Sequence, residues 1–322
     1  MLFDTRSLTG LSLAIGGFLA ASAIGCSQAN QSSEAPPSPE EPSQVESTAD
    51  APLRVAVGGM ITPRGGFAYY RDLLDYIESE IGRPVQFSDR KSYAEINALL
   101  KSGKVDAGFV CGGPYVDGHE DFGLELLVMP QVDGKTEYYS TILVPAGGPT
   151  KRLEDLRGKR FAFADPKSNT GKLVPTYLLS KMNETPEAFF ARYIYTYAHD
   201  KSVRAVAEKA VDGAAVDSLI WDYMRRGDPQ LESKVTEIWR SPPYGIPPVV
   251  VRPGLDSEIK GRLRAILLDA HNDDTARPIL EGMAVEKFVV GNDSAYDAIR
   301  EMKRWVEQQR DVRAMNPRPA AY

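Results

Sequence analysis

Three adjacent polar residues, Ser168, Asn169 and Thr170, give the clearest indication of chemistry in this 322-residue sequence. They follow an apolar segment, 161–164, that is typical of a buried strand, and they precede a segment that is typical of a helix. Backbone N–H groups at the start of a helix lack partners, and the helix dipole is positive there. The pattern therefore indicates either a cage of donors for a tetrahedral oxyanion or an ordinary helix cap. From the loop alone we favour the cap, because capping is the commoner use of these residues.

The rest of the sequence gives little indication of catalysis or metal binding. The three His residues, His119, His199 and His271, are far apart, and none has a Cys or His partner at metal-ligand spacing. No G-x-S-x-G or G-x-G-x-x-G motif occurs. Gly134-Lys135-Thr136 resembles the end of a P-loop, but Met129 stands where that motif needs Gly. We predict no catalytic residue, no cofactor and no metal, although a triad can be assembled from distant residues.

The apolar pattern predicts the elements that position the loop. From Leu53 onward, strands and helices alternate as βαβαβ, which is typical of a parallel sheet covered by helices. A long strand over 137–145 follows, and the pattern then restarts. We predict two similar α/β halves. If the closing helices pack on the first half, the chain crosses between lobes near Val144 and Val250, and a ligand cleft lies between hinged lobes.

This organisation gives specific boundaries. The predicted strands are 53–57, 85–87, 107–110, 124–132, 137–145, 160–164, 193–197, 214–216, 234–240 and 248–252. The predicted helices are 66–81, 93–102, 153–157, 171–182, 201–210, 218–226, 256–271, 274–281 and 294–309. Lobe 1 is predicted to comprise 53–143 and 251–322, and lobe 2 to comprise 144–250.

The N-terminus has the features of an export signal. Arg6 precedes an uncharged apolar run that closes on Ala23-Ile24-Gly25-Cys26. These four residues resemble the bacterial lipobox, in which the Cys is acylated and becomes the first residue, although Ala23 stands where Leu is usual. We predict a lipoprotein signal peptide over 1–25, with Cys26 lipidated. An uncleaved anchor helix or an ordinary secretory signal is the alternative, and every reading places the domain outside the cytoplasm.

A Pro-rich acidic segment, 26–52, separates this signal from the folded region. It carries five of the six excess negative charges of the chain and no aromatic residue, so we predict a disordered tether. The folded region is nearly neutral, which gives no electrostatic case for nucleic-acid binding. With Cys26 lipidated, Cys111 has no disulfide partner and is most simply a small buried hydrophobe.

Residues 165–175 identify a family. They read D-P-K-S-N-T-G-K-L-V-P and resemble the D-P-x-S-x-[ST]-G-x-x-x-P signature of solute-binding proteins of phosphate, phosphite and phosphonate ABC importers. Further matches occur in the same order, so the resemblance spans roughly 53 to 300 and is far more specific than one motif. They include 91–95, 103–108, 113–115, 138–144, 156–162, 199–200, 211–217 and 238–242.

The resemblance implies a fold, a ligand and a partner. The fold is that of type II periplasmic binding proteins, an α/β fold with two lobes and a hinge. Such a protein captures a small phosphorus oxyanion and delivers it to an inner-membrane ABC permease. By resemblance, the anion is held by Ser168, Asn169 and Thr170, by Tyr93 and Tyr138, and by His199. An enzyme on the same scaffold and a ligand-sensing component of a signalling system are the alternatives.

The sequence also favours one group of ligands within that class. Relatives that bind aminoalkylphosphonates carry acids that pair with the ammonium group, whereas Leu219 and the acid-free segment 242–248 stand at the matching positions here. An ammonium group without a counter-ion would be buried at high cost. Asp217 is the one acid nearby that could bind an amine. We therefore favour phosphite or a simple phosphonate over an aminoalkylphosphonate, and also over phosphate.

Overall fold

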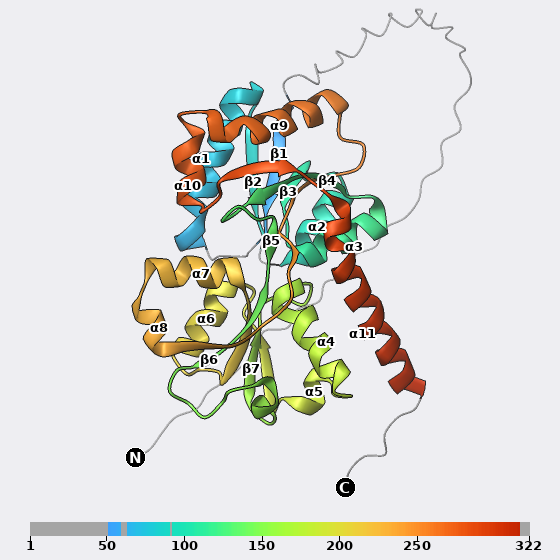
Figure 1. The fold of residues 1–322 in the computed structure, drawn as a ribbon. Coiled ribbons are helices and arrows are strands. Elements are labelled where there is room, and N and C mark those ends of the chain that lie inside the picture. The colour runs from blue at the N-terminus through green and yellow to red at the C-terminus, as the bar shows by residue number, and fades with distance from the viewer. Residues whose placement is uncertain (1–50, 59–62, 91, 316–322) are drawn as a thin grey trace, which may run out of the picture. The chain divides into compact units, whose positions relative to one another are not determined.

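The computed structural model describes residues 51–58, 63–90 and 92–315. The predicted signal peptide, Cys26 and all but the last two residues of the predicted tether lie outside the described residues. The described residues all belong to one compact unit (Figure 1).

The first sheet is built around β1 (Leu53–Val57), a short apolar run that is almost wholly buried. It pairs in parallel with β2 (Val85–Asp89) and β3 (Ala107–Phe109), as the βαβαβ pattern predicts. Three more strands complete the sheet in the order β13-β4-β12-β3-β1-β2, and they make it mixed rather than parallel. These are β4 (Glu125–Gln131), β12 (Val249–Val251) and β13 (Lys287–Val290), and their pairings are all antiparallel. The predicted parallel pairing was confirmed for β1, β2 and β3, but the sheet as a whole is mixed, because β12 and β13 add antiparallel pairings.

The second sheet repeats this plan in the order β10-β6-β9-β7-β8. Strand β7 (Arg160–Phe163) pairs in parallel with β8 (Arg192–Tyr195) and β9 (Gly213–Asp217). Strands β6 (Ser140–Pro145) and β10 (Val235–Arg240) pair antiparallel on the other side. Two similar α/β halves are therefore present.

Two connections run between the sheets, side by side. The predicted strand over 137–145 is broken at Tyr139, and its first part, β5 (Glu137–Tyr138), pairs with β11 (Tyr244–Gly245) in a separate two-stranded ladder. Ser140 already belongs to the second sheet, and Val249 already belongs to the first. The chain therefore changes sheets a few residues before Val144 and Val250. Tyr138 lies on the connecting ladder, where it can contact groups from both halves.

Eleven α-helices lie within the described residues. They are α1 (Pro63–Ile81), α2 (Tyr93–Lys101), α3 (Gly112–Phe122), α4 (Val174–Lys181), α5 (Pro186–Phe189), α6 (His199–Ala207), α7 (Ser218–Gly227), α8 (Gln230–Lys234), α9 (Ser257–Asp269), α10 (Ala276–Gly282) and α11 (Asp297–Met315). Three 3-10 helices occur at Leu153–Leu156, Ala270–Asn272 and Asp293–Tyr296, and a π-helical turn occurs at Asn169–Leu173. The sequence patterns did not predict α3, α5, α8, β11 or β13.

The helices cover both faces of each sheet (Figure 1). Helices α1, α9 and α10 pack on one face of the first sheet, and α2, α3 and α11 contribute to the apolar cluster on the other face. The closing helices thus pack on the first half, as expected. Helix α11 also packs against α4, whose Lys181 Nζ lies 3.4 Å from the ring centroid of Trp305.

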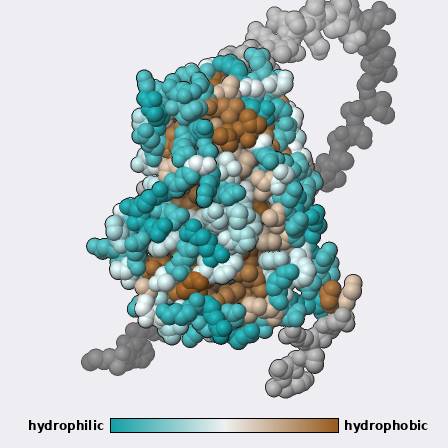
Figure 2. Space-filling model, in the orientation of Figure 1, coloured by the Kyte–Doolittle hydropathy of each residue, from teal (hydrophilic) through white to brown (hydrophobic). Residues whose placement is uncertain are grey.

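The outer surface adds little to the account of function. On the face shown in Figure 2, hydrophilic residues predominate and hydrophobic areas are smaller and scattered. No helix within the described ranges is long and apolar enough to span a membrane.

Candidate anion-binding site

The loop between β7 and α4 holds three buried polar side chains. Ser168, Asn169 and Thr170 are each at most 1% exposed. Ser168 caps the π-helical turn, because its Oγ accepts a hydrogen bond of 3.0 Å from the Gly171 N–H. The Thr170 Oγ1 and Asn169 Oδ1 atoms, in contrast, are buried without any partner among the described residues. Capping therefore accounts for Ser168 but leaves Thr170 and Asn169 unexplained, and an unpaired buried polar group is costly.

Groups of the first half hold this loop in place. The backbone N–H groups of Tyr93 and Lys167 donate to the two carboxyl oxygens of Asp165, over 3.1 and 2.7 Å. The Lys167 ammonium group pairs with Asp117 of α3 at 2.9 Å. Asp165 thus links the loop to the first residue of α2, so Tyr93 is brought toward the loop despite 72 residues of separation.

The two predicted Tyr ligands are buried, neutral hydroxyl groups. Tyr93 is 2% exposed, and its Oη has no partner within the described part of the protein. Tyr138 is fully buried, and its Oη accepts a hydrogen bond of 3.0 Å from Asn169 Nδ2, which leaves the hydroxyl proton free to donate. Burial raises the pKa of both phenols well above the ordinary value, so both keep their protons near neutral pH.

His199, the first residue of α6, faces the same loop. Its Nδ1 accepts a hydrogen bond of 3.1 Å from the Asp217 N–H, so the proton of the neutral ring must lie on Nε2. Nε2 lies 3.5 Å from Ser168 Oγ. Burial lowers the pKa of His199 to about 3, which keeps the ring uncharged at neutral pH. The ring is therefore oriented as a neutral donor toward the loop.

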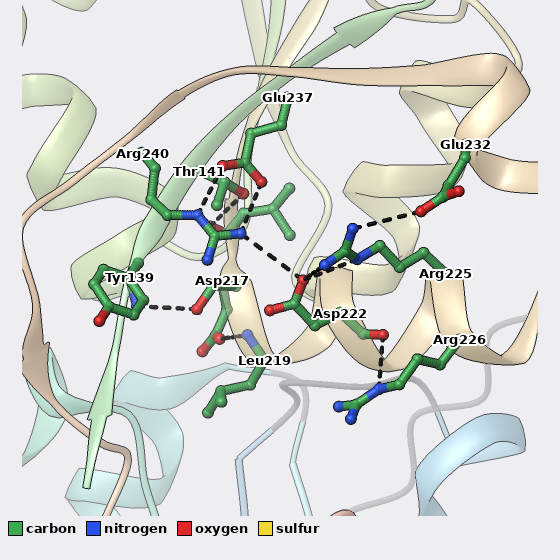
Figure 3. A network of polar contacts seen from close by, with 12 residues as sticks. Tyr139, Thr141, Asp217, Leu219, Asp222, Arg225, Arg226, Glu232, Glu237 and Arg240 are labelled. Atoms are coloured by element: carbon green, nitrogen blue, oxygen red, sulfur yellow. Dashed lines mark hydrogen bonds and ion pairs between the residues drawn. The ribbon is translucent and has the colours of Figure 1, made fainter. Parts of the chain in front are cut away.

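Asp217 ends β9 and caps α7. Its Oδ1 accepts a hydrogen bond of 2.8 Å from the Leu219 N–H, while Oδ2 is buried with no partner in the described part of the chain. Burial raises the pKa of this carboxyl group to about 7, and the nearby Asp222 adds to the shift. Figure 3 shows Asp217 beside the start of α7, next to the ion pairs that Asp222 makes with Arg225 and Arg240. Other groups that interact electrostatically with Asp217 are Tyr70, Tyr93, Cys111 and Tyr138.

A cavity of about 110 Å³ lies beside Asp217. Its lining comes from elements of both halves and is mostly apolar. Leu219 lines it, and the predicted acid-free segment, 242–248, adds Ile246, Pro247 and Pro248. Its lining includes one carboxyl group, that of Asp217, and one guanidinium group, that of Arg226. The space beside Asp217 therefore suits a small apolar group better than an amine.

The structure thus brings the predicted site residues together. Direct contacts link Tyr138 to Asn169, Ser168 to His199, and His199 to Asp217. Tyr93 joins through Asp165, while the Thr170 carbonyl accepts a hydrogen bond of 2.7 Å from Ser140 Oγ of β6. Among the described residues, no cluster of three His, Cys, Asp or Glu side chains could hold a metal ion.

Sequence reasoning missed three residues near this cluster. Tyr70 of α1 and Phe109 of β3 line the cavity, and Cys111 lies 3.6 Å from Tyr138 Oη by its Sγ atom. Cys111 is fully buried, as predicted, but its neighbours are polar. The only local signal was its place between a buried strand and Gly112-Gly113.

Two α/β sheets joined by a double connection, with buried polar groups from both halves at the junction, define a two-lobed binding protein of the type II periplasmic class. A family model described as "ABC transporter, phosphonate, periplasmic substrate-binding protein" matches residues 61–296. The chain belongs to this family. It is therefore the extracytoplasmic substrate-binding component of an ABC transporter, which works with a membrane permease.

Individual relatives agree with this assignment. The chain is 25% identical to the phosphonates-binding periplasmic protein of Escherichia coli K12 over 241 residues, which cover 73% of this chain and 71% of that protein. A crystal structure of the binding protein of a Pseudomonas aeruginosa ABC phosphonate transporter aligns with a TM-score of 0.77 and 22% identity, over 84% of this chain and 91% of that one. PhnD1 of Prochlorococcus marinus in complex with methylphosphonate aligns with a TM-score of 0.71 and 18% identity, over 80% of this chain and 98% of that one. At these identities, the two structures support the fold.

Proposed function

We propose that this protein captures phosphite or a simple phosphonate in a cleft between its two lobes and delivers it to an inner-membrane permease. The observation that supports this most is the set of buried polar groups without partners around the 168–170 loop. Tyr93 Oη and Thr170 Oγ1 are donors of this kind, and Tyr138, Ser168 and His199 add neutral donors. Hydrogen bonds from neutral groups to an anion are strong, and they avoid burying a Lys or Arg side chain beside a small ligand.

The proposed ligand site comprises Tyr93, Tyr138, Ser168, Asn169, Thr170, His199 and Asp217. The proposed lobes are 53–143 with 251–322 and 144–250, except that residues 140–143 and 249–250 pair in the sheet of the other lobe. The apolar cavity beside Asp217 gives room for a hydrogen or a small alkyl group on phosphorus. It offers an amine no counter-ion except Asp217, and burial favours the uncharged form of that acid. The cavity therefore favours phosphite or methylphosphonate over 2-aminoethylphosphonate.

We expect Thr170→Ala to weaken methylphosphonate binding by about 1.5–3 kcal/mol, the range for a hydrogen bond to a charged group. Because Thr170 Oγ1 has no partner among the residues that the structure describes, the variant should lose no internal hydrogen bond and should keep its melting temperature. Calorimetric titration and thermal unfolding on the same samples measure both quantities. Thr170→Ser, which retains the hydroxyl group, should recover most of the affinity.

Thr185→Ala is the matched control, since Thr185 caps α5 by accepting a hydrogen bond from the Ala188 N–H. Loss of this cap should lower the free energy of unfolding by about 1 kcal/mol and leave affinity unchanged. If Thr170→Ala behaves like this control, the loop is a structural cap and the proposed anion site is wrong.

We also propose that the protein is lipid-anchored through Cys26, faces the periplasm and performs no chemical turnover. We expect Cys26→Ser to abolish acylation and to release the protein from the membrane fraction, while methylphosphonate binding is retained. Mass spectrometry of the mature N-terminus, with fractionation of both proteins, tests this directly. A wild-type N-terminus generated at another cleavage site, with the Cys26 thiol unmodified, would contradict the anchor.

Phosphorus NMR distinguishes a binding protein from an enzyme. A binding protein should release its bound ligand chemically unchanged.

A further inference from the structure

Cys111 occupies an unusual place for a buried thiol. It follows β3 and is the residue immediately before α3, and its side chain is fully buried. Its Sγ lies 3.6 Å from Tyr138 Oη, and that oxygen also accepts the hydrogen bond from Asn169 Nδ2. The sulfur is therefore a direct neighbour of the Tyr138 hydroxyl group, which is a proposed ligand donor.

The remaining neighbours of the sulfur are also polar. The Cys111 side chain also interacts electrostatically with the backbone of Asn169 in the loop and with that of Gly113. Tyr93 and Asp217 both interact with Cys111 electrostatically, and each has a buried oxygen that no described residue pairs with. A thiol is a weak acceptor, so sulfur alone satisfies the Tyr93 hydroxyl group poorly. An oxyanion oxygen beside the sulfur would accept the hydrogen bond of this hydroxyl group better.

We propose that Cys111 is a ligand-contacting residue, whose S–H group lies in the oxyanion site and donates to an oxygen of the bound phosphorus oxyanion. In the free protein the sulfur interacts with donors that the ligand takes over. This inference rests on the proposed function, because it places a further residue in the same site. Burial raises the pKa of the Cys111 thiol, which keeps the S–H proton available for donation.

The test uses the full-length chain in a Cys26→Ser background, in which Cys111 is the only thiol. Methyl methanethiosulfonate converts the thiol into a methyl disulfide and releases methanesulfinate, with the thiol proton passing to solvent. We expect saturating methylphosphonate to slow this reaction at least tenfold, and we expect the modified protein to bind methylphosphonate at least about a hundredfold more weakly. Cys111→Ser, which keeps a small donor, should retain affinity within about threefold, whereas Cys111→Ala should lose about fivefold or more.

Ligand binding also protects buried thiols by stabilising the folded state as a whole, so a control thiol is needed. Ser180 of α4 is buried, and none of the contacts that define the proposed site involves it. In Ser180→Cys combined with Cys111→Ser, methylphosphonate should give much weaker protection. The proposed contact is wrong if methylphosphonate protects both thiols equally, or if Cys111 reacts at the same rate with and without the ligand. In either case, the proposed function still stands if the parent protein binds methylphosphonate. If the parent binds no phosphorus oxyanion, both proposals are wrong.

Discussion

Asp217→Asn is expected to stabilise the protein at pH 8, by roughly 2–4 kcal/mol in the free energy of unfolding. Asp217 is fully buried, and burial raises its pKa to about 7 from an ordinary value of 3.8. The folded protein therefore binds this proton more tightly than the unfolded chain does. The stability associated with the neutral acid is fully present below about pH 3.8 and is lost as the pH rises through about 7.

Asn resembles the protonated acid in this position. Its Oδ1 can still accept the hydrogen bond that Asp217 accepts from the Leu219 N–H, so the helix cap is kept. Chemical denaturation at several pH values measures the difference, which should shrink below about 2 kcal/mol at pH 5. The pKa of His199 is lowered by burial to about 3, so its contribution to stability falls as the pH decreases below about 6.5. That contribution is common to both proteins and cancels in the comparison.

Asp256→Asn provides the matched control. Asp256 also caps a helix through its Oδ1, but it is exposed to solvent. Its replacement should change stability little at either pH. A destabilised Asp217→Asn protein at pH 8 would mean that the Asp217 carboxylate has a stabilising partner that the structure does not indicate.

Gly113→Ala is expected to weaken phosphonate binding by about 3 kcal/mol, or roughly 150-fold. A Cβ atom on Gly113 would lie 2.4 Å from the carbonyl oxygen of Lys167 and 3.1 Å from the Asn169 nitrogen. These are backbone atoms of the ligand loop, so they cannot move aside as a flexible side chain would. The contact joins α3 of the first half to the loop of the second, so the added methyl group should hold the two apart.

We expect the two halves to shift apart at their double connection without unfolding, so the Gly113→Ala protein should remain folded with a modest loss of stability. Titration with methylphosphonate and thermal unfolding are the measurements. Gly261→Ala in α9 is the control, because a Cβ atom there meets nothing within 4 Å and should alter neither affinity nor fold. Wild-type affinity in Gly113→Ala would show that binding does not require the loop to lie against α3.

The parts of the fold that sequence patterns predicted are those with local causes. Helix α1 buries Leu73, Leu74, Ile77 and Ile81, which recur at helical spacing, and its prediction was confirmed. Helix α3 was missed because Gly112–Phe122 contains three Gly residues, a Pro and several charged residues instead of a periodic apolar face. Its end is defined by Gly123 in the left-handed conformation, which a pattern of apolar residues does not reveal.

The site shows the same division between local and long-range information. The strand, the polar triplet and the following helix are consecutive, so their arrangement could be predicted from the sequence. The break at Tyr139 could not, because it arises from the pairing of Glu137–Tyr138 with β11 more than 100 residues later. The polar surroundings of Cys111 likewise depend on Tyr138, Asn169 and Asp217, which only the folded chain brings together.

Calorimetric titration of the full-length protein with phosphite, methylphosphonate, 2-aminoethylphosphonate, phosphate and sulfate tests the central claim most directly. We predict saturable binding of phosphite or methylphosphonate that is at least about tenfold tighter, or 1.4 kcal/mol, than binding of 2-aminoethylphosphonate. Equal or tighter binding of the amine would contradict the proposed ligand class and would identify Asp217 as the partner of the ammonium group. Binding of none of the phosphorus compounds would contradict the proposed function itself.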